Sequence, residues 1–222
     1  MGRVLPISFN TDMVLAILDG RKTVTRRLVK KSQCMLADRK EPYELDRKYA
    51  PFDSMTDREL IKSTYKEPYK PGDTLYVRET WSFLPCIECM DEGPACNVNP
   101  VVYDDGDCES EGCFVYKASH PRPERVRWTP SIHMPKDATR IWLKVTDVRV
   151  ERLHDMTLDD FLAEGVAIRP EAFNDPENAY MQARSEFARI WDSTIRKSQT
   201  DLNSWVWVIE FERCEKPITS KN

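Results

Sequence analysis

One short segment combines cationic and hydroxyl side chains in a spacing suited to chemistry: Gly20-Arg21-Lys22-Thr23-Val24-Thr25-Arg26-Arg27. A lysine acts as a general base only when burial or nearby cations lower its pKa. The neighbouring arginines would have that effect on Lys22, and a threonine hydroxyl beside a neutral amine is a nucleophile. The functional hypothesis is therefore a pocket in which a lysine meets a threonine. The alternative is a solvated basic edge strand without chemistry.

A carboxylate is the second component of this hypothesis. Glu164 directly precedes Gly165, where we expect a short helix to end. A carboxylate at a helix C-terminus faces the negative end of the helix dipole and needs a cationic partner. Glu164 is therefore either directed at Lys22 or an ordinary surface glutamate.

The cysteines suggest a metal site. Five of them lie within residues 84–113, in the spacing Cys86-x2-Cys89 followed by Cys108-x4-Cys113. This spacing resembles that of a structural zinc site, and a segment with little apolar content needs such a cross-link. We predict zinc bound by these four cysteines, with Cys96 as an alternative ligand. Reduced thiols without metal are the other interpretation.

Aromatic residues in loops offer a surface for a base. Trp81, Trp128 and His133 fall outside the periodic segments and could stack on a base, although a histidine between prolines is more often structural. The other tryptophans are in periodic segments and are expected in the core: Trp142, Trp191, Trp205 and Trp207.

Strands and helices must position these groups. Alternating or β-branched residues predict strands at residues 4–9, 23–29, 74–80, 114–117, 139–150 and 205–211. In a strand, Thr23, Thr25 and Arg27 share one face. The alternation in 139–150 slips after Val145, which predicts a β-bulge near Thr146-Asp147.

Local signals predict about three helices. Asn10 or Thr11 can cap a helix that ends at Gly20. Residues 157–160 resemble a capping box, and this short helix would end at Gly165. Asp175-Pro176 starts a third helix. Residues 32–70 form a polar, irregular surface excursion, and residues 84–113 a Cys-rich insertion. We therefore expect an α+β fold with a small, closed or half-closed mixed sheet.

Composition limits the partners. The chain has 222 residues and a net charge of −4, so contact with nucleic acid would be local rather than global. A base or nucleoside fits this balance better. The N-terminus lacks the apolar stretch of a signal peptide, and no run has the ~20 apolar residues that span a membrane. We expect a cytoplasmic protein without membrane contact.

Taken together and in this order, the motifs resemble an ASCH-domain protein of the PUA-like superfamily. The resemblance is greater to phage and prophage ASCH proteins, which are often labelled as morphogenetic. It covers nearly the whole chain outside 32–70 and 84–113. The segments that carry it are 17–27, 71–81, 128–135, 145–150, 163–165 and 205–211.

This resemblance implies one domain over residues 1–222, folded as a PUA-like β-barrel with a pocket sized for a base. Small bacterial ASCH proteins are amidohydrolases that remove the acyl group from N4-acetylcytidine, and their catalytic triad corresponds to Lys22, Thr25 and Glu164. No cofactor takes part in this catalysis. We expect the substrate to contact Arg21, Thr23, Arg27, Arg78, Glu79, Trp81, Ser131 and His133.

Several alternatives remain open at this point. Thr25 could be the nucleophile with Lys22 as its base, or Lys22 and Glu164 could activate water while Thr25 binds the substrate. The length, the cysteine insertion and the proline-rich loop depart from the small enzymes. The competing functions are an RNA-binding module, with or without RNA cleavage, and a phage accessory or assembly factor without catalysis.

Overall fold

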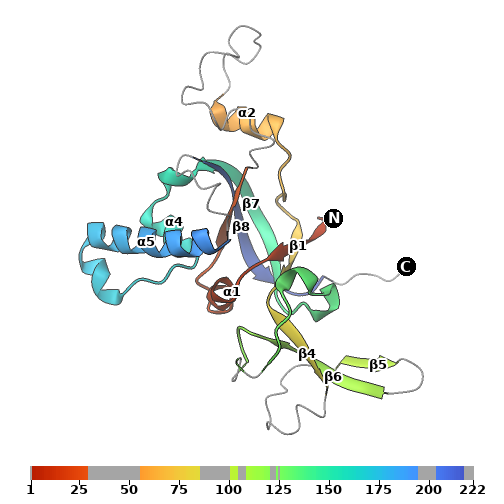
Figure 1. The fold of residues 1–222 in the computed structure, drawn as a ribbon. Coiled ribbons are helices and arrows are strands. Elements are labelled where there is room, and N and C mark those ends of the chain that lie inside the picture. Colours follow the sequence, from red (N-terminus) through yellow and green to blue (C-terminus); the bar gives the residue numbers. More distant parts are fainter. Residues whose placement is uncertain are drawn as a thin grey trace.

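The computed structural model describes residues 2–29, 56–85, 101–104, 109–120, 124, 126–194 and 204–217. A five-stranded mixed sheet forms the centre (Figure 1). Its strands are β1 (Val4–Ser8), β2 (Val24–Leu28), β3 (Thr74–Arg78), β7 (Trp142–Arg152) and β8 (Trp205–Cys214). The order is β1-β3-β7-β8-β2, in which β1 and β3 are parallel and the other pairs antiparallel.

A smaller, three-stranded antiparallel sheet projects from one end of the central sheet (Figure 1). It has the order β4-β6-β5 and consists of β4 (Trp81–Pro85), β5 (Val101–Asp104) and β6 (Glu109–Tyr116). Residues 84–113 are the predicted Cys-rich insertion. Those of them that the structure describes belong to this sheet.

Helices border the central sheet, with α4 and α5 together on one side of it and α2 at the end away from the small sheet (Figure 1). The α-helices are α1 (Thr11–Leu18), α2 (Asp57–Thr64), α4 (Leu158–Ala163) and α5 (Pro176–Thr194). Short 3-10 turns are η4 (Ser131–His133), η5 (Lys136–Ala138), η6 (Leu153–Asp155) and η7 (Pro170–Asn174). Among the described helices, none is both long enough and apolar enough to cross a membrane.

The predicted helix boundaries are confirmed. Asn10 Oδ1 accepts a hydrogen bond from the backbone N–H of Met13 at the start of α1. Thr157 and Asp160 form a reciprocal capping box at the start of α4. After α1 and α4 the chain turns at Gly20 and Gly165, whose φ angles of +75° and +92° favour glycine.

The predicted bulge is also present. The pairing of β7 with β8 shifts register between Val145 and Asp147, so Asp147 rather than Thr146 lies opposite Glu210. The extra residue at the bulge shifts the alternation of side chains by one position. Apolar residues after the bulge are therefore buried again, as Val148 is, at 4% exposed.

Both faces of the central sheet are covered. On β8, Trp207 and Ile209 belong to the core cluster that includes α1, whereas Val206 and Val208 belong to the cluster under α4 and α5. A strand buried on both faces is apolar at nearly every position, as the first half of β8, Trp205–Ile209, is. The tryptophans expected to be buried are so: Trp142, Trp191, Trp205 and Trp207.

Two expectations need correction or remain open. Helix α2 lies inside the segment expected to be irregular; a capping box of Thr56 and Glu59 starts it, and Ile61 is 1% exposed in the core.

The mixed α+β class is confirmed, but a closed barrel is not observed. Within the described residues, β1 and β2 are the sheet edges, and no strand pairing joins them.

Candidate functional site

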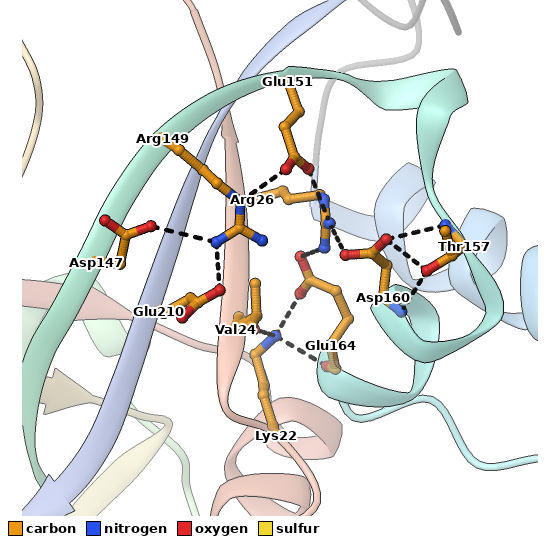
Figure 2. A network of polar contacts seen from close by, with 10 residues as sticks. All are labelled: Lys22, Val24, Arg26, Asp147, Arg149, Glu151, Thr157, Asp160, Glu164 and Glu210. Atoms are coloured by element: carbon orange, nitrogen blue, oxygen red, sulfur yellow. Dashed lines mark hydrogen bonds and ion pairs between the residues drawn. The ribbon is translucent and has the colours of Figure 1, made fainter.

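Lys22 and Glu164 form a buried ion pair (Figure 2). Lys22 follows the turn after α1, and Glu164 is the C-terminal cap residue of α4. Their backbones form an antiparallel bridge beside β2. Lys22 Nζ lies 2.5 Å from Glu164 Oε2, with side-chain exposures of 0% and 5%. The alternatives considered above are therefore wrong for these two residues: Lys22 is not solvated, and Glu164 is not a surface glutamate.

The ammonium group of Lys22 has a complete set of acceptors. Nζ donates to the backbone oxygens of Val24 (2.7 Å) and Glu164 (2.9 Å) as well as to the Glu164 carboxylate. Burial nevertheless lowers the pKa of Lys22; Glu164 opposes this shift, and the charges of Arg27 and Arg26 add to it. Desolvation penalises the charged form of a lysine, so the site favours a neutral amine more than water does.

Arg26 is a member of the site that the sequence analysis missed. Its side chain is 0% exposed and lies under α4, where it contacts Asp160 at 2.6 Å and Glu164 and Glu151 at 3.4 Å each (Figure 2). Glu164 therefore lies between two buried cations. A signal was available, because Asp160 and Glu164 are four residues apart in one helical segment and share a face.

The charges continue from this buried group toward the surface. Glu151 also accepts a hydrogen bond from Arg149 Nε at 2.7 Å. Arg149 in turn contacts Glu210 and Asp147, the residue at the bulge of β7 (Figure 2). The ion pairs thus form one network from Lys22 to half-exposed carboxylates on β7 and β8.

Thr25 lies on the face of β2 opposite to that of Arg26. It pairs with Ile209 of β8 and is 1% exposed. Alternation places Thr25 and Arg27 on one face and Arg26 on the opposite one. Thr23, which was expected to share the face of Thr25, precedes the strand and is exposed.

An open pocket of about 640 Å³ lies beside the pair, between β1, the start of α1 and the residues 130–131. Three of the predicted substrate-binding residues line it: Arg27, Arg78 and Ser131. Phe9 and Tyr69 supply aromatic surface. The pocket volume is in the range typical of small-molecule sites.

Phe9 borders both the pocket and the ion pair. Its ring centroid lies 5.6 Å from Lys22 Nζ and 5.4 Å from Arg27 Cζ. Phe9 is 3% exposed, and Lys22 is not among the residues that line the pocket. A ligand in the pocket would therefore reach Lys22 past the Phe9 ring.

Other predicted contact residues lie outside the lining of this pocket. Arg21 is exposed and donates to Asp19 and to the backbone oxygen of Gly165. Glu79 is 1% exposed and forms a double hydrogen bond with Arg140, both at 2.9 Å. Its role in the structure is to neutralise that arginine.

The loop aromatics form contacts of their own. Trp81 packs edge-on against Phe114 in the small sheet, and Trp128 lies edge-on to His120. His133 is exposed in η4. The structure therefore does not bring these three predicted base-stacking residues together with Lys22 and Glu164.

Most of the predicted zinc ligands lie outside the described residues: Cys86, Cys89, Cys96 and Cys108. Cys113 is buried in β6 and is 1% exposed. Within the described part of the chain, no group of three or more His, Cys, Asp or Glu residues has a geometry suited to a metal ion. The zinc site stays a prediction.

Comparisons with protein-family models, curated proteins and solved structures gave no match. The ion pair, the buried threonine and the arginine-lined pocket are therefore the basis for a functional assignment.

Proposed function

We propose that this protein is an amidohydrolase that removes the acyl group from an N4-acylated cytidine or a similarly modified nucleoside, and that its sheet is part of an ASCH, PUA-like barrel. The observation that carries the proposal is the buried contact between Lys22 and Glu164 beside an arginine-lined pocket. A buried ion pair is not needed for stability, because apolar residues of similar volume often serve as well. Buried ionisable groups beside a cavity are typical of catalytic sites.

In the proposed reaction, Lys22 acts from its neutral form, which burial favours by lowering its pKa. Lys22 Nζ takes the proton from Thr25 Oγ, and Thr25 attacks the acyl carbonyl carbon. The C–N bond breaks and the nucleoside amine leaves with the proton that Lys22 took up. Water then hydrolyses the acyl ester on Thr25, which releases the carboxylic acid and restores the hydroxyl.

The other residues position these groups. Glu164 holds Lys22 through a 2.5 Å contact, and Arg26 holds the second oxygen of the Glu164 carboxylate. Arg27 follows Thr25 by two residues on the same face of β2 and lines the pocket. It is therefore suited to bind a charged group of the substrate, and a backbone N–H beside Thr25 would stabilise the oxyanion of the tetrahedral intermediate. Productive binding requires the Phe9 ring to move aside.

The test is release of cytidine from N4-acetylcytidine, followed by liquid chromatography. Wild type should be active, whereas Lys22→Met and Glu164→Gln should lose at least about 100-fold in kcat, as expected for a general base and its partner. Lys144→Met, on the exposed face of β7, is the matched control and should be fully active. Inactivity of folded wild-type protein on both N4-acetylcytidine and its 5′-monophosphate would rule out the assignment.

Substitution of Thr25 separates the two mechanisms. If Thr25 is the nucleophile, Thr25→Ser retains activity and Thr25→Val abolishes it. If Lys22 and Glu164 activate water directly, Thr25→Val keeps measurable turnover. Thr146→Val, at the exposed bulge of β7, controls for loss of a strand hydroxyl.

A further inference from the structure

The pocket beside the ion pair carries positive charge without a counter-charge in its wall. Arg27 enters it from β2 and Arg78 from the end of β3. Among the described residues that line it, none is an aspartate or a glutamate. Two guanidinium groups therefore face one cavity in a chain whose net charge is −4.

Strand β1 brings the two arginines to the same place. The parallel pairing of β1 with β3 puts Ser8 opposite Arg78. Arg27 Nη2 donates to the backbone oxygen of Ser8 at 3.0 Å. Ser8 of β1 therefore positions both arginines: Arg78 is its partner in the strand register, and Arg27 donates a hydrogen bond to it.

Neither guanidinium is neutralised within the described part of the chain. The hydrogen bonds of Arg78 are long, at 3.4 Å to the backbone oxygen of Ile132 and to the hydroxyl of Tyr76, and its Cζ lies 5.4 Å from the centre of the Tyr76 ring. Its buried Nε has no hydrogen-bond partner among the described residues. In the described residues, no carboxylate lies within ion-pair distance of Arg27 or Arg78. By contrast, the buried Arg26 contacts Asp160 at 2.6 Å.

A guanidinium group that is partly buried and lacks a carboxylate has donors available for an anion of matching geometry, and phosphate offers it paired acceptors. The hydroxyl groups of Thr80 and Ser131 also line this pocket and can donate to phosphate oxygens. Tyr69 adds an aromatic face of the kind on which a base stacks. The pocket therefore combines anion-binding and base-binding surfaces.

We propose that this pocket binds a nucleoside monophosphate, with Arg27 and Arg78 holding its phosphate group. The substrate would then be a phosphorylated nucleoside rather than a free one. The identity of the base rests on the proposed function, whereas the phosphate site rests on the two arginines alone. A polynucleotide is the competing source of the same phosphate chemistry.

The test measures binding rather than hydrolysis, by isothermal titration of the full chain in phosphate-free buffer at low salt. Cytidine 5′-monophosphate should bind at least about tenfold more tightly than cytidine, since one charge-assisted contact contributes about 1.5–3 kcal/mol. Arg78→Gln and Arg27→Gln should each remove this preference while cytidine binding is unchanged. Arg184→Gln, an exposed residue of α5, is the matched control and should bind as wild type does.

Equal binding of nucleoside and nucleotide by wild type, or an unchanged nucleotide affinity in Arg78→Gln, would overturn the proposal. A short cytidine oligonucleotide that binds while the mononucleotide does not would assign the site to a strand instead. Circular dichroism verifies the fold of each variant. Because these ligands have no acyl group, the result is independent of whether the protein hydrolyses N4-acetylcytidine.

Discussion

Lys22 and Glu164 are 142 residues apart in the sequence, yet the Nζ of one lies 2.5 Å from Oε2 of the other in a buried setting. The same carboxylate contacts Arg26 through its other oxygen. Among the described residues, Glu164 is therefore the acid that contacts both buried cations, Lys22 and Arg26. Its loss should affect stability as well as catalysis.

Glu164→Gln should lower the free energy of unfolding by about 3–5 kcal/mol, because it leaves buried charges without their shared partner. Urea unfolding at pH 7, followed by tryptophan fluorescence, measures this. Glu186→Gln is the matched control, since Glu186 pairs with Arg189 on the exposed surface of α5 and such pairs contribute under about 1 kcal/mol. Equal effects of the two substitutions would contradict the prediction.

The stability difference between wild type and Lys22→Met should change with pH. Burial lowers the pKa of Lys22 below its ordinary value of 10.5. Between the lowered and the ordinary pKa, the unfolded chain binds more protons than the folded protein, so wild-type stability rises with pH relative to the variant. Unfolding experiments at pH 7, 8, 9 and 10 measure this difference. A constant difference over this range would show that the pKa of Lys22 is not lowered in the folded protein.

Arg26 should tolerate neither removal nor shortening. Arg26→Met leaves Asp160 and Glu164 facing each other beneath α4, and we expect a loss of about 3–5 kcal/mol. Arg26→Lys should recover only part of this loss, because an ammonium group lacks the planar fork that reaches several carboxylates. Thermal and urea unfolding measure both. The exposed Arg189→Met should cost less than about 1 kcal/mol; a similarly small effect at Arg26 would mean that the network adds little stability.

Gly165→Ala should destabilise more than Gly20→Ala, although both glycines have a positive φ. A methyl group at Gly165 would lie 2.6 Å from Ala16 Cβ and 2.9 Å from Lys22 Cβ, whereas at Gly20 nothing lies within 4 Å. Backbone strain alone costs about 1–3 kcal/mol, and the contacts at Gly165 add to it. A comparison of unfolding midpoints tests this, and equal midpoints would argue against close packing at Gly165.

Features with a local cause could be predicted from the sequence. The caps at Asn10 and Thr157 satisfy backbone groups within three residues, and the bulge near Asp147 appears as a break in alternation. The contact of Lys22 with Glu164 was expected from the resemblance and from the unfavourable place of a carboxylate at a helix end. These signals need no knowledge of distant strands.

The remaining features depend on long-range packing. Alternation along β2 separates Arg26 from Thr25 and Arg27, but it does not reveal that α4 covers the face of Arg26. The parallel pairing that puts Arg78 beside Ser8 joins strands separated by 70 positions. Helix α2 was missed because it is short and polar, with Leu60 and Ile61 as its apolar residues, although its capping box was visible at Thr56 and Glu59.

The position of Glu164 has a consequence beyond the chemistry proposed for it. Strand β2 is an edge of the central sheet in the described residues, and just ahead of it the N–H of Thr23 donates to the backbone oxygen of Ala163 while Lys22 bridges to Glu164. Exposed edges are where another molecule can add a strand and begin aggregation. The end of α4 blocks this approach at the start of β2, so variants that release it should be judged by their solubility as well as by their turnover.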